Sequence, residues 1–321
     1  MSMDADVSQF ETPFFLVGCV RSGTTVLRLM LGHHSRVCNC DEMDYVTPAL
    51  VGASGPVAVD EYAERLRRDR AFNLLDYQIR EDLDFEGVVR DFLAQRSSVD
   101  KAPVVGATVH HHFEEMPRIF PEAKYVYLRR DPRDVARSCV KMGWAGSAWG
   151  GAAFWLAASA SWDRLREQVP AENCFELTYE RLLEDTVGVM TELCEFLGLQ
   201  FEPSMLDIEK DTTYSKLNPG VAQSWRESAS VDEIKQVEAR IGEGKLAASG
   251  YQLSGLPALR LTPLRRGGIR LSDFIARTRR RVEIYGLSLW MQGVLSRRLP
   301  IEGYRRYVQR KIDAVDNANL K

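Results

Sequence analysis

GCVRSGTT, at residues 18–25, is the stretch that decides the fold of this chain. The apolar run at residues 14–17 comes directly before it and predicts a short buried strand. Apolar residues follow it at helical spacing, at Val26, Leu27, Met30 and Leu31. Strand, glycine-bearing loop and helix in this order are typical of a loop that binds phosphate, because glycine lets the backbone approach an anion and the N–H groups at the helix start point toward it.

The spacing of this loop is that of a Walker A motif, G-x-x-x-x-G-K-[ST], with one difference. Thr24 occupies the position of the lysine that would neutralise the phosphates of a nucleoside triphosphate. The nearest cation is Arg21, inside the loop. Read by itself, the segment is either a phosphate loop that uses Arg21 or a glycine and serine turn that leads into a helix.

The composition is that of an ordinary globular protein, with 45% hydrophobic and 27% charged residues among 321. Residues 1–10 carry two aspartates and neither lysine nor arginine, unlike a signal peptide, and no stretch reaches the roughly 18 apolar residues of a membrane span. We therefore expect a cytoplasmic protein whose six cysteines are reduced thiols. Cys38 and Cys40 have no second pair at zinc-finger spacing, so we expect no metal site there.

Charge is distributed unevenly along the chain. The formal net charge is −3, but residues 255–321 hold 15 Lys and Arg against 5 Asp and Glu, a net charge of +10. The first 254 residues therefore carry −13. This contrast predicts a main domain at residues 1–254 and a basic, mainly helical extension at residues 255–321.

Strand-like and helical patterns alternate along the main domain. Short apolar runs predict further strands at residues 104–106, 123–128 and 174–177. Helical patterns alternate with them, over residues 60–95, 132–142, 155–169, 182–197 and 231–242. Such alternation favours an α/β fold with three layers (α/β/α) and a central parallel sheet, like that of the P-loop nucleoside triphosphatases.

A second strand-and-helix unit, YVYLRRDPRDVARS at residues 125–138, carries a cluster of arginines. Asp131 and Asp134 flank a proline and an arginine at a good helix start. Arg130 at the strand end and Ser138 on the helix supply donors for a second phosphate, and the helix dipole favours the anion. In an isolated segment the arginines would rather pair with the two aspartates. Beside the first loop, phosphate binding is the better interpretation.

Together the two segments resemble PAPS-dependent sulfotransferases, which transfer a sulfuryl group from 3′-phosphoadenosine 5′-phosphosulfate (PAPS). The resemblance covers residues 14–251 and depends on the two phosphate motifs. It implies that the first loop holds the phosphosulfate, through Arg21, Ser22, Gly23, Thr24 and Thr25. It also implies that Arg130 and Ser138 bind the 3′-phosphate and that Tyr179 contacts the adenine. Read alone, Tyr179 is equally well a half-buried aromatic side chain at a strand end.

Residues 21–48 resemble tyrosylprotein sulfotransferases in particular, with matching residues at Arg28, His34 and Pro48. In that register Glu42 falls on the catalytic base of those enzymes. A carboxylate just past the first helix could take the proton of an acceptor hydroxyl. The alternative is a solvated loop residue in the acidic segment DEMD, residues 41–44.

A rival base lies in VGATVHHH, residues 105–112. Many sulfotransferases have a lysine that assists the leaving group and a histidine that acts as base in this segment. Ala107 stands near the lysine position, so Arg21 would take over the neutralisation of charge. His110 is the best candidate among the three histidines, since an imidazole pKa near neutrality suits proton transfer at pH 7. The histidines lack spaced partners and sulfuryl transfer needs no metal, so we expect none.

The segment that would close the nucleotide site departs from the family pattern. Ser224 stands where tyrosylprotein sulfotransferases have a lysine, just before the tryptophan that Trp225 matches. Arg226 or Lys216 would then take the place of that lysine.

The basic extension has no assigned role in catalysis. Arginines precede and follow an apolar stretch at residues 282–296, which is too short to cross a bilayer but suits an interfacial helix. We expect it to contact a membrane surface, or to dock on the acidic main domain or on a second copy of the chain.

These motifs predict an in-line, metal-independent transfer of the sulfuryl group from PAPS to an acceptor, with Glu42 or His110 as base and Arg21 and the loop stabilising the leaving group. The products would be the sulfated acceptor and 3′-phosphoadenosine 5′-phosphate (PAP). The acceptor is a hydroxyl or an amine of unknown identity, and no nucleic-acid partner is expected. Two other functions stay open, a small-molecule kinase and a non-catalytic nucleotide-binding or membrane-surface scaffold. The kinase would need the missing lysine and a magnesium ligand, and the scaffold would lack a usable base.

Overall fold

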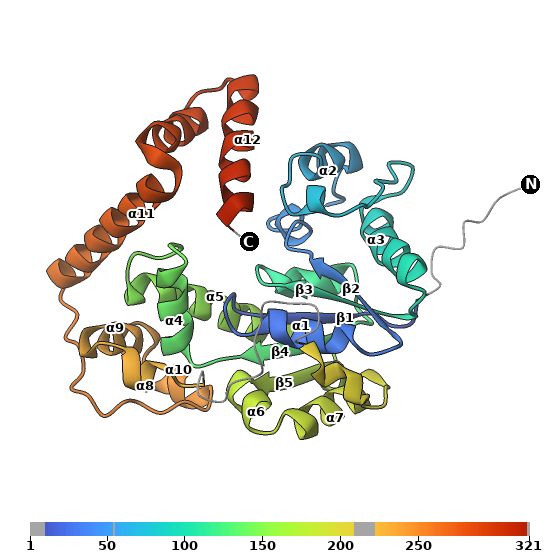
Figure 1. The fold of residues 1–321 in the computed structure, drawn as a ribbon, viewed down its shortest axis with the longest axis horizontal. Coiled ribbons are helices and arrows are strands. Elements are labelled where there is room, and N and C mark those ends of the chain that lie inside the picture. The colour runs from blue at the N-terminus through green and yellow to red at the C-terminus, as the bar shows by residue number, and fades with distance from the viewer. Residues whose placement is uncertain (1–9, 54, 209–221, 320–321) are drawn as a thin grey trace, which may run out of the picture. The chain divides into compact units, whose positions relative to one another are not determined.

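The computed structural model describes residues 10–53, 55–208 and 222–319. At its centre is a parallel five-stranded sheet in the order β2-β3-β1-β4-β5 (Figure 1). The strands are β1 (Phe14–Gly18), β2 (Val37–Glu42), β3 (Val104–Val109), β4 (Lys124–Arg129) and β5 (Cys174–Thr178). Because β1 lies between β3 and β4, the residues that follow these three strands meet at one edge of the sheet.

One face of the sheet packs against three helices, α1 (Thr24–Gly32), α6 (Tyr179–Glu184) and α7 (Thr186–Leu197). Side chains alternate along a strand, so Phe14 and Leu16 of β1 both point to this face. Both are fully buried there, in one hydrophobic cluster with apolar residues of the three helices. This layer holds the start of α1 firmly at the end of β1.

The opposite face is covered by α3 (Phe85–Asp100) and α5 (Ala148–Arg166). Tyr127 of β4 stacks on Trp162 of α5, with ring centroids 4.7 Å apart. Phe15 contacts Phe120, with ring centroids 5.0 Å apart. The guanidinium of Arg90 on α3 lies over the Phe120 ring, 4.7 Å from its centroid. Helices on both faces confirm the predicted α/β/α layers.

The structure differs from the predicted elements at three places. β2 was not expected, because its sequence VCNCDE lacks an apolar alternation. The helical pattern at residues 60–95 is two helices, α2 (Val59–Leu66) and α3, with irregular chain between them. The helix predicted at residues 182–197 breaks at Asp185, because that carboxylate caps α7 by accepting from the backbone N–H of Gly188 at 3.0 Å.

The chain forms two compact units, one made of the described parts of residues 1–135 and 154–227, the other of residues 136–153 and 228–319. The sheet belongs to the first unit. The remaining helices are α4 (Pro132–Lys141), α8 (Trp225–Ser228), α9 (Val231–Ile241), α10 (Glu243–Ala248), α11 (Pro263–Arg298) and α12 (Glu302–Asn319). The helical extension is therefore confirmed, whereas the boundary at residue 254 stays a prediction.

Asp273 of α11 fixes the extension to the glycine-rich segment before α5, inside the second unit. Its carboxylate accepts from the N–H of Gly146 at 3.0 Å and from the hydroxyl of Ser147 at 2.8 Å. A Cβ atom on Gly150 would lie 2.1 Å from the same carboxylate. A side chain at position 150 would therefore clash with Asp273, so glycine is needed there.

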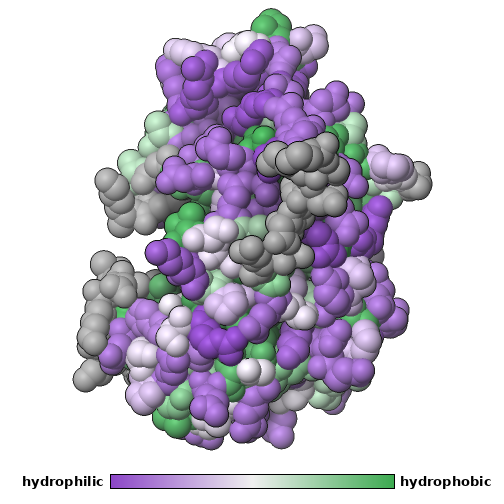
Figure 2. Space-filling view, turned by 90° about the vertical axis from the view of Figure 1, so that its right-hand side faces the viewer, coloured by the Kyte–Doolittle hydropathy of each residue, from purple (hydrophilic) through white to green (hydrophobic). Residues whose placement is uncertain are grey.

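No helix among the described residues is long and apolar enough to cross a membrane. The surface drawn in Figure 2, on the right-hand side of Figure 1, is mostly hydrophilic with scattered hydrophobic side chains. All six cysteines fall within the described residues, and they are free thiols, as predicted.

Candidate functional site

The predicted phosphate loop connects β1 to α1 and needs unusual backbone angles. Gly18 is closely packed, since a Cβ atom there would lie 2.4 Å from the carbonyl oxygen of Leu128 on β4. Arg21 lies in the left-handed region with φ 68°, and Gly23 follows with φ 100°. The N–H of Ser22 donates to the carbonyl of Cys19 at 3.1 Å, which closes a tight turn.

This turn corrects one detail of the prediction, because the N–H of Ser22 already has an acceptor inside the loop. The donors left for an anion are the N–H groups of the first turn of α1, which includes Thr24 and Thr25. Gly23 is the N-cap and gives no side-chain hydrogen bond, and the first turn holds no acidic residue. The hydroxyl of Ser22 is fully buried without a partner among the described residues. The uncapped start of α1 and the buried Ser22 hydroxyl are both suited to binding an oxyanion.

Gly23, Tyr179 and Arg130 form one stack beside the loop. A Cβ atom on Gly23 would lie 2.4 Å from the ring of Tyr179. The guanidinium of Arg130 lies over that ring, 4.6 Å from its centroid, and donates to the carbonyl of Arg21 at 3.5 Å. The structure therefore brings together three of the residues that the sequence assigned to nucleotide binding.

We expect Gly23→Ala to lower the free energy of unfolding by about 2–5 kcal/mol, because it adds a clash with Tyr179 to a backbone strain of about 1–2 kcal/mol. Gly52→Ala is the matched control, since Gly52 has φ 73° and no atom lies within 4 Å of the place that its Cβ atom would take. Urea denaturation of both variants measures the difference. Equal losses in the two variants would mean that the stack does not constrain the loop.

The segment RDPRD builds a buried network at the start of α4. Arg133 forms a bidentate pair with Asp131, at 2.9 and 2.7 Å, and its guanidinium lies 3.7 Å from the ring centroid of Trp225. The indole N–H of Trp225 donates to Asp131 at 3.0 Å, and its backbone N–H donates to Asp134 at 2.8 Å. Arg133 is thus a structural residue, as the alternative interpretation of the arginines held. Ser224, in place of the family's lysine, also donates to Asp134, at 2.8 Å.

Two predicted ligands receive less support. Ser138 lies half-buried on α4, in the second unit, so its role toward the 3′-phosphate stays a prediction. Arg226 lies over the ring of Trp225 at 4.6 Å and donates to Gln223 at 2.6 Å. Lys216 falls outside the described residues.

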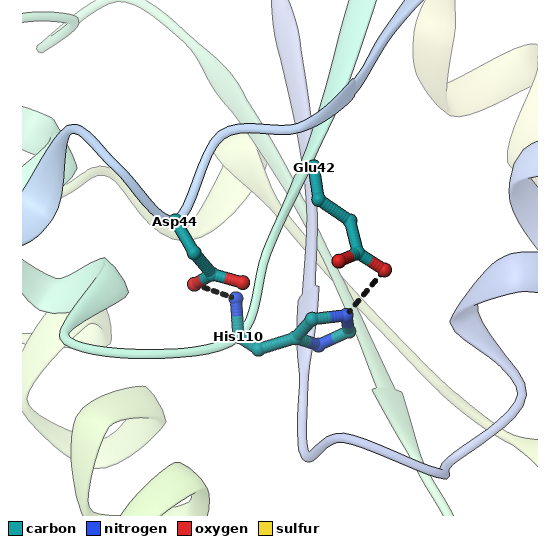
Figure 3. Close-up of side chains that lie close together, drawn as sticks. All are labelled: Glu42, Asp44 and His110. Carbon is teal, nitrogen blue, oxygen red and sulfur yellow. Dashed lines mark hydrogen bonds and ion pairs between the residues drawn. The ribbon is translucent and has the colours of Figure 1, made fainter. Parts of the chain in front are cut away.

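Glu42 and His110, the two rival bases, lie side by side at the ends of β2 and β3 (Figure 3). The Nε2 atom of His110 is 3.6 Å from Oε1 of Glu42. A bulge in β2 produces this pairing: Asn39 aligns with Gly106, but three residues later Glu42 aligns with Thr108. The extra residue turns the Glu42 side chain toward β3.

His110 is held in one orientation by its neighbours. Its Nδ1 atom is 3.1 Å from the carbonyl oxygen of Gly18, and its backbone N–H donates to Asp44 at 2.8 Å. Since a carbonyl can only accept, Nδ1 carries a proton, and in the neutral ring Nε2 is the basic nitrogen. His110 is 7% exposed, whereas the Glu42 side chain is 51% exposed. Nε2 therefore faces an accessible carboxylate.

The two groups shift each other's pKa. The interaction with His110 lowers the pKa of Glu42 and outweighs the opposing effect of burial. Burial lowers the pKa of His110, but the charges of Glu42 and Asp44 and the Gly18 carbonyl together raise it above its usual value. The pair thus favours a carboxylate beside an imidazolium, and His110 accepts a proton more readily than an isolated histidine.

Glu42, Asp44 and His110 each place one ligand atom within 4.8 Å of the others, close enough to bind a cation. One oxygen of Asp44 already accepts from two backbone N–H groups, those of His110 and His111, at 2.8 and 2.9 Å. Asp44 therefore has a structural task, and a metal-independent reaction stays a prediction.

Two of the other matches to tyrosylprotein sulfotransferases have partners within the structure. Arg28 forms an ion pair with Asp41. His34 is 4% exposed, and its Nε2 atom is 2.9 Å from the carbonyl oxygen of Gln200. Ala107 is fully buried inside β3, so no cation comes from the position where the family has a lysine.

Comparisons with known proteins indicate the family of the chain. Residues 13–203 match the model of the sulfotransferase family. An uncharacterized protein of Aquifex aeolicus is 30% identical over 228 residues, a match that covers 62% of this chain and 27% of that protein. Sulfotransferase 2A6 of Rattus norvegicus is 30% identical over 104 residues, 27% of this chain and 36% of that enzyme. The matches thus span about a third or less of the length of these relatives.

The fold has a counterpart among solved structures. The sulfotransferase domain from the curacin biosynthetic pathway matches with a TM-score of 0.51 and 17% identity, over 77% of this chain and 100% of that domain. This similarity supports the α/β fold alone.

Proposed function

The chain belongs to the sulfotransferase family, and on that basis we propose that it transfers a sulfuryl group from PAPS to a hydroxyl or an amine of an acceptor. One observation carries the proposal. A glycine-bearing loop without the Walker A lysine, the Arg130 stack and the His110–Glu42 pair follow three adjacent strands, β1, β4 and β3. They are the parts needed to hold an anionic donor and to deprotonate an acceptor.

The residues around the loop fit the donor. The buried Ser22 hydroxyl and the uncapped start of α1 offer hydrogen-bond donors to the phosphosulfate, with Arg21 as cation. Arg130 adds a charge beside the loop for the 3′-phosphate, and Tyr179 beneath it contacts the adenine. Ser138 is proposed as a further ligand of the 3′-phosphate on the basis of the sequence alone.

His110 is the proposed base, and Glu42 its partner. Nε2 of His110 takes the proton of the acceptor, whose oxygen or nitrogen then forms the new bond to sulfur while the bond from sulfur to the bridging oxygen of PAPS breaks. Glu42 stabilises the imidazolium that results. The N–H groups of α1 and the Arg21 cation stabilise the charge on the departing phosphate, because β3 supplies no lysine.

Transfer of ³⁵S from labelled PAPS tests the proposal, with a cell extract as the source of acceptors. We expect labelled products with the wild-type chain and none with an Arg130→Ala, His110→Asn double variant. Untargeted comparison of sulfated metabolites between the same two samples would then identify the acceptor. Stabilisation by ATP without binding of PAP would instead favour a kinase, and PAP binding without any transfer would favour a scaffold.

A further inference from the structure

The basic extension presents an apolar stripe whose side chains are exposed or half-buried. After a break at Gly286, which has φ 72° and ψ 155°, the second part of α11 runs to Arg298 and packs along α12 (Figure 1). The apolar residues of this part recur at helical spacing, at Leu287, Trp290, Met291, Val294 and Leu295. Leu287, Met291 and Leu295 expose 59%, 56% and 50% of their surface.

The packed side of the same helix holds two small residues and the half-buried Leu289. Gly293 and Ser296 are buried, and a Cβ atom on Gly293 would lie 3.2 Å from the side chain of Ile312 on α12. The two helices are also joined by the hydroxyl of Tyr285, which donates to Asp316 at 2.7 Å. Successive residues turn by about 100°, so Gly293 and Ser296 lie opposite the stripe. The hairpin of α11 and α12 is therefore formed without using the apolar stripe.

Arginines continue the stripe at its end. Arg297 follows Trp290 by seven residues and Arg298 follows Met291 by seven, so both return to the same side of the helix. Both side chains are exposed, and neither has an acidic partner within 4 Å among the residues that the structure describes. The whole extension carries a net charge of +10. Apolar side chains beside unpaired cations match a surface that is apolar below and anionic above.

We propose that this stripe binds the surface of an anionic lipid bilayer, with the apolar side chains among the acyl chains and Arg297 and Arg298 at the lipid phosphates. The charge argues against a second copy, because a dimer through this stripe would bring together two extensions that each carry a net charge of +10. The proposal is independent of the reaction, since the stripe shares no residue with the His110 site.

Cosedimentation of the full chain with vesicles tests the proposal, using phosphatidylcholine alone or mixed three to two with phosphatidylserine, at about 0.1 M salt. We expect binding to the anionic vesicles only. The triple variant Leu287→Ser, Met291→Ser, Leu295→Ser should bind at least about tenfold more weakly. The double variant Arg297→Gln, Arg298→Gln should lose about fivefold for each arginine.

The matched control is Leu74→Ser, Val99→Ser, Val187→Ser, three changes at side chains that are 65%, 75% and 50% exposed in the first unit. It should bind like the wild type, and PAP binding checks that every variant is folded. Equal binding of the stripe variant and the control would overturn the proposal, as would equal binding to neutral and anionic vesicles. A dimer in solution that the stripe variant abolishes, without vesicle binding, would assign the stripe to a second copy instead.

Discussion

His110→Asn is expected to lower kcat for sulfuryl transfer by about 10²–10⁴-fold while changing the affinity for PAP by less than about twofold. The reason is the position of Nε2, which is the basic nitrogen of the ring and faces the exposed carboxylate of Glu42 at 3.6 Å. His112→Asn is the matched control, because the side chain of His112 is 51% exposed and its Nδ1 atom is 4.0 Å from Glu114. Steady-state transfer with labelled PAPS and calorimetric titration with PAP measure the two quantities.

The partner of His110 gives this prediction its sharpest form. Glu42→Gln removes a charge that raises the pKa of His110. The pKa of His110 should therefore be lower in the variant than in the wild type. Because a base must be unprotonated, the rate rises with pH through the pKa of His110. This rising part of the pH–rate profile should move to lower pH in the variant. The double variant should be no slower than His110→Asn alone. If Glu42→Gln removed all activity while His110→Asn kept it, Glu42 would be the base.

Arg130→Ala is expected to weaken PAP binding by about 10–150-fold, the effect of losing a charged hydrogen bond of about 1.5–3 kcal/mol. Arg130 lies over Tyr179 and beside the loop, whereas its neighbour Arg129 points to Glu176, 3.7 Å away. Arg129→Ala is therefore the matched control and should bind PAP like the wild type. Calorimetric titration measures both affinities.

Measuring the stability of Arg130→Ala separates a role of Arg130 in nucleotide binding from a purely structural role. Arg130 is also 3.9 Å from Asp134, whose pKa is raised by burial despite that charge. Removing Arg130 will therefore lower stability as well, by leaving Asp134 with less compensation. A variant that is less stable but binds PAP with unchanged affinity would contradict the assignment of Arg130 to the nucleotide.

The sequence predicted what depends on local pattern. The loop between β1 and α1 is punctuated by glycines and bounded by an apolar run and a helical pattern, so its structure could be expected from a few consecutive residues. The same holds for the start of α4, where an aspartate precedes a proline. Both features are decided by short-range backbone constraints.

The arrangement of the base could not be predicted in this way. Glu42 and His110 are distant in sequence, and they meet only because β2 pairs with β3 through a bulge after Asn39. A polar strand such as β2 gives little periodic signal. The sequence therefore treated as rivals two residues that the structure places in one pair. The support of Trp225 by Asp131 has the same long-range character.

The apolar stripe on α11 was visible in the sequence as a short hydrophobic stretch between arginines. Its outward orientation was not, because any amphipathic helix has an apolar face and the face that packs is normally the apolar one. Here the packed side holds Gly293, Ser296 and only one apolar residue of this stretch, Leu289. Only the fold decides which side of such a helix is buried.

The most direct test of the central claim is transfer of ³⁵S from labelled PAPS by the wild-type chain, with PAP formation followed in the same sample. We expect labelled acceptor and PAP in equal amounts, both lost in His110→Asn and retained in His112→Asn. Absence of labelled product from the wild-type chain across extracts that contain acceptors, together with PAP binding no tighter than that of ATP, would contradict it.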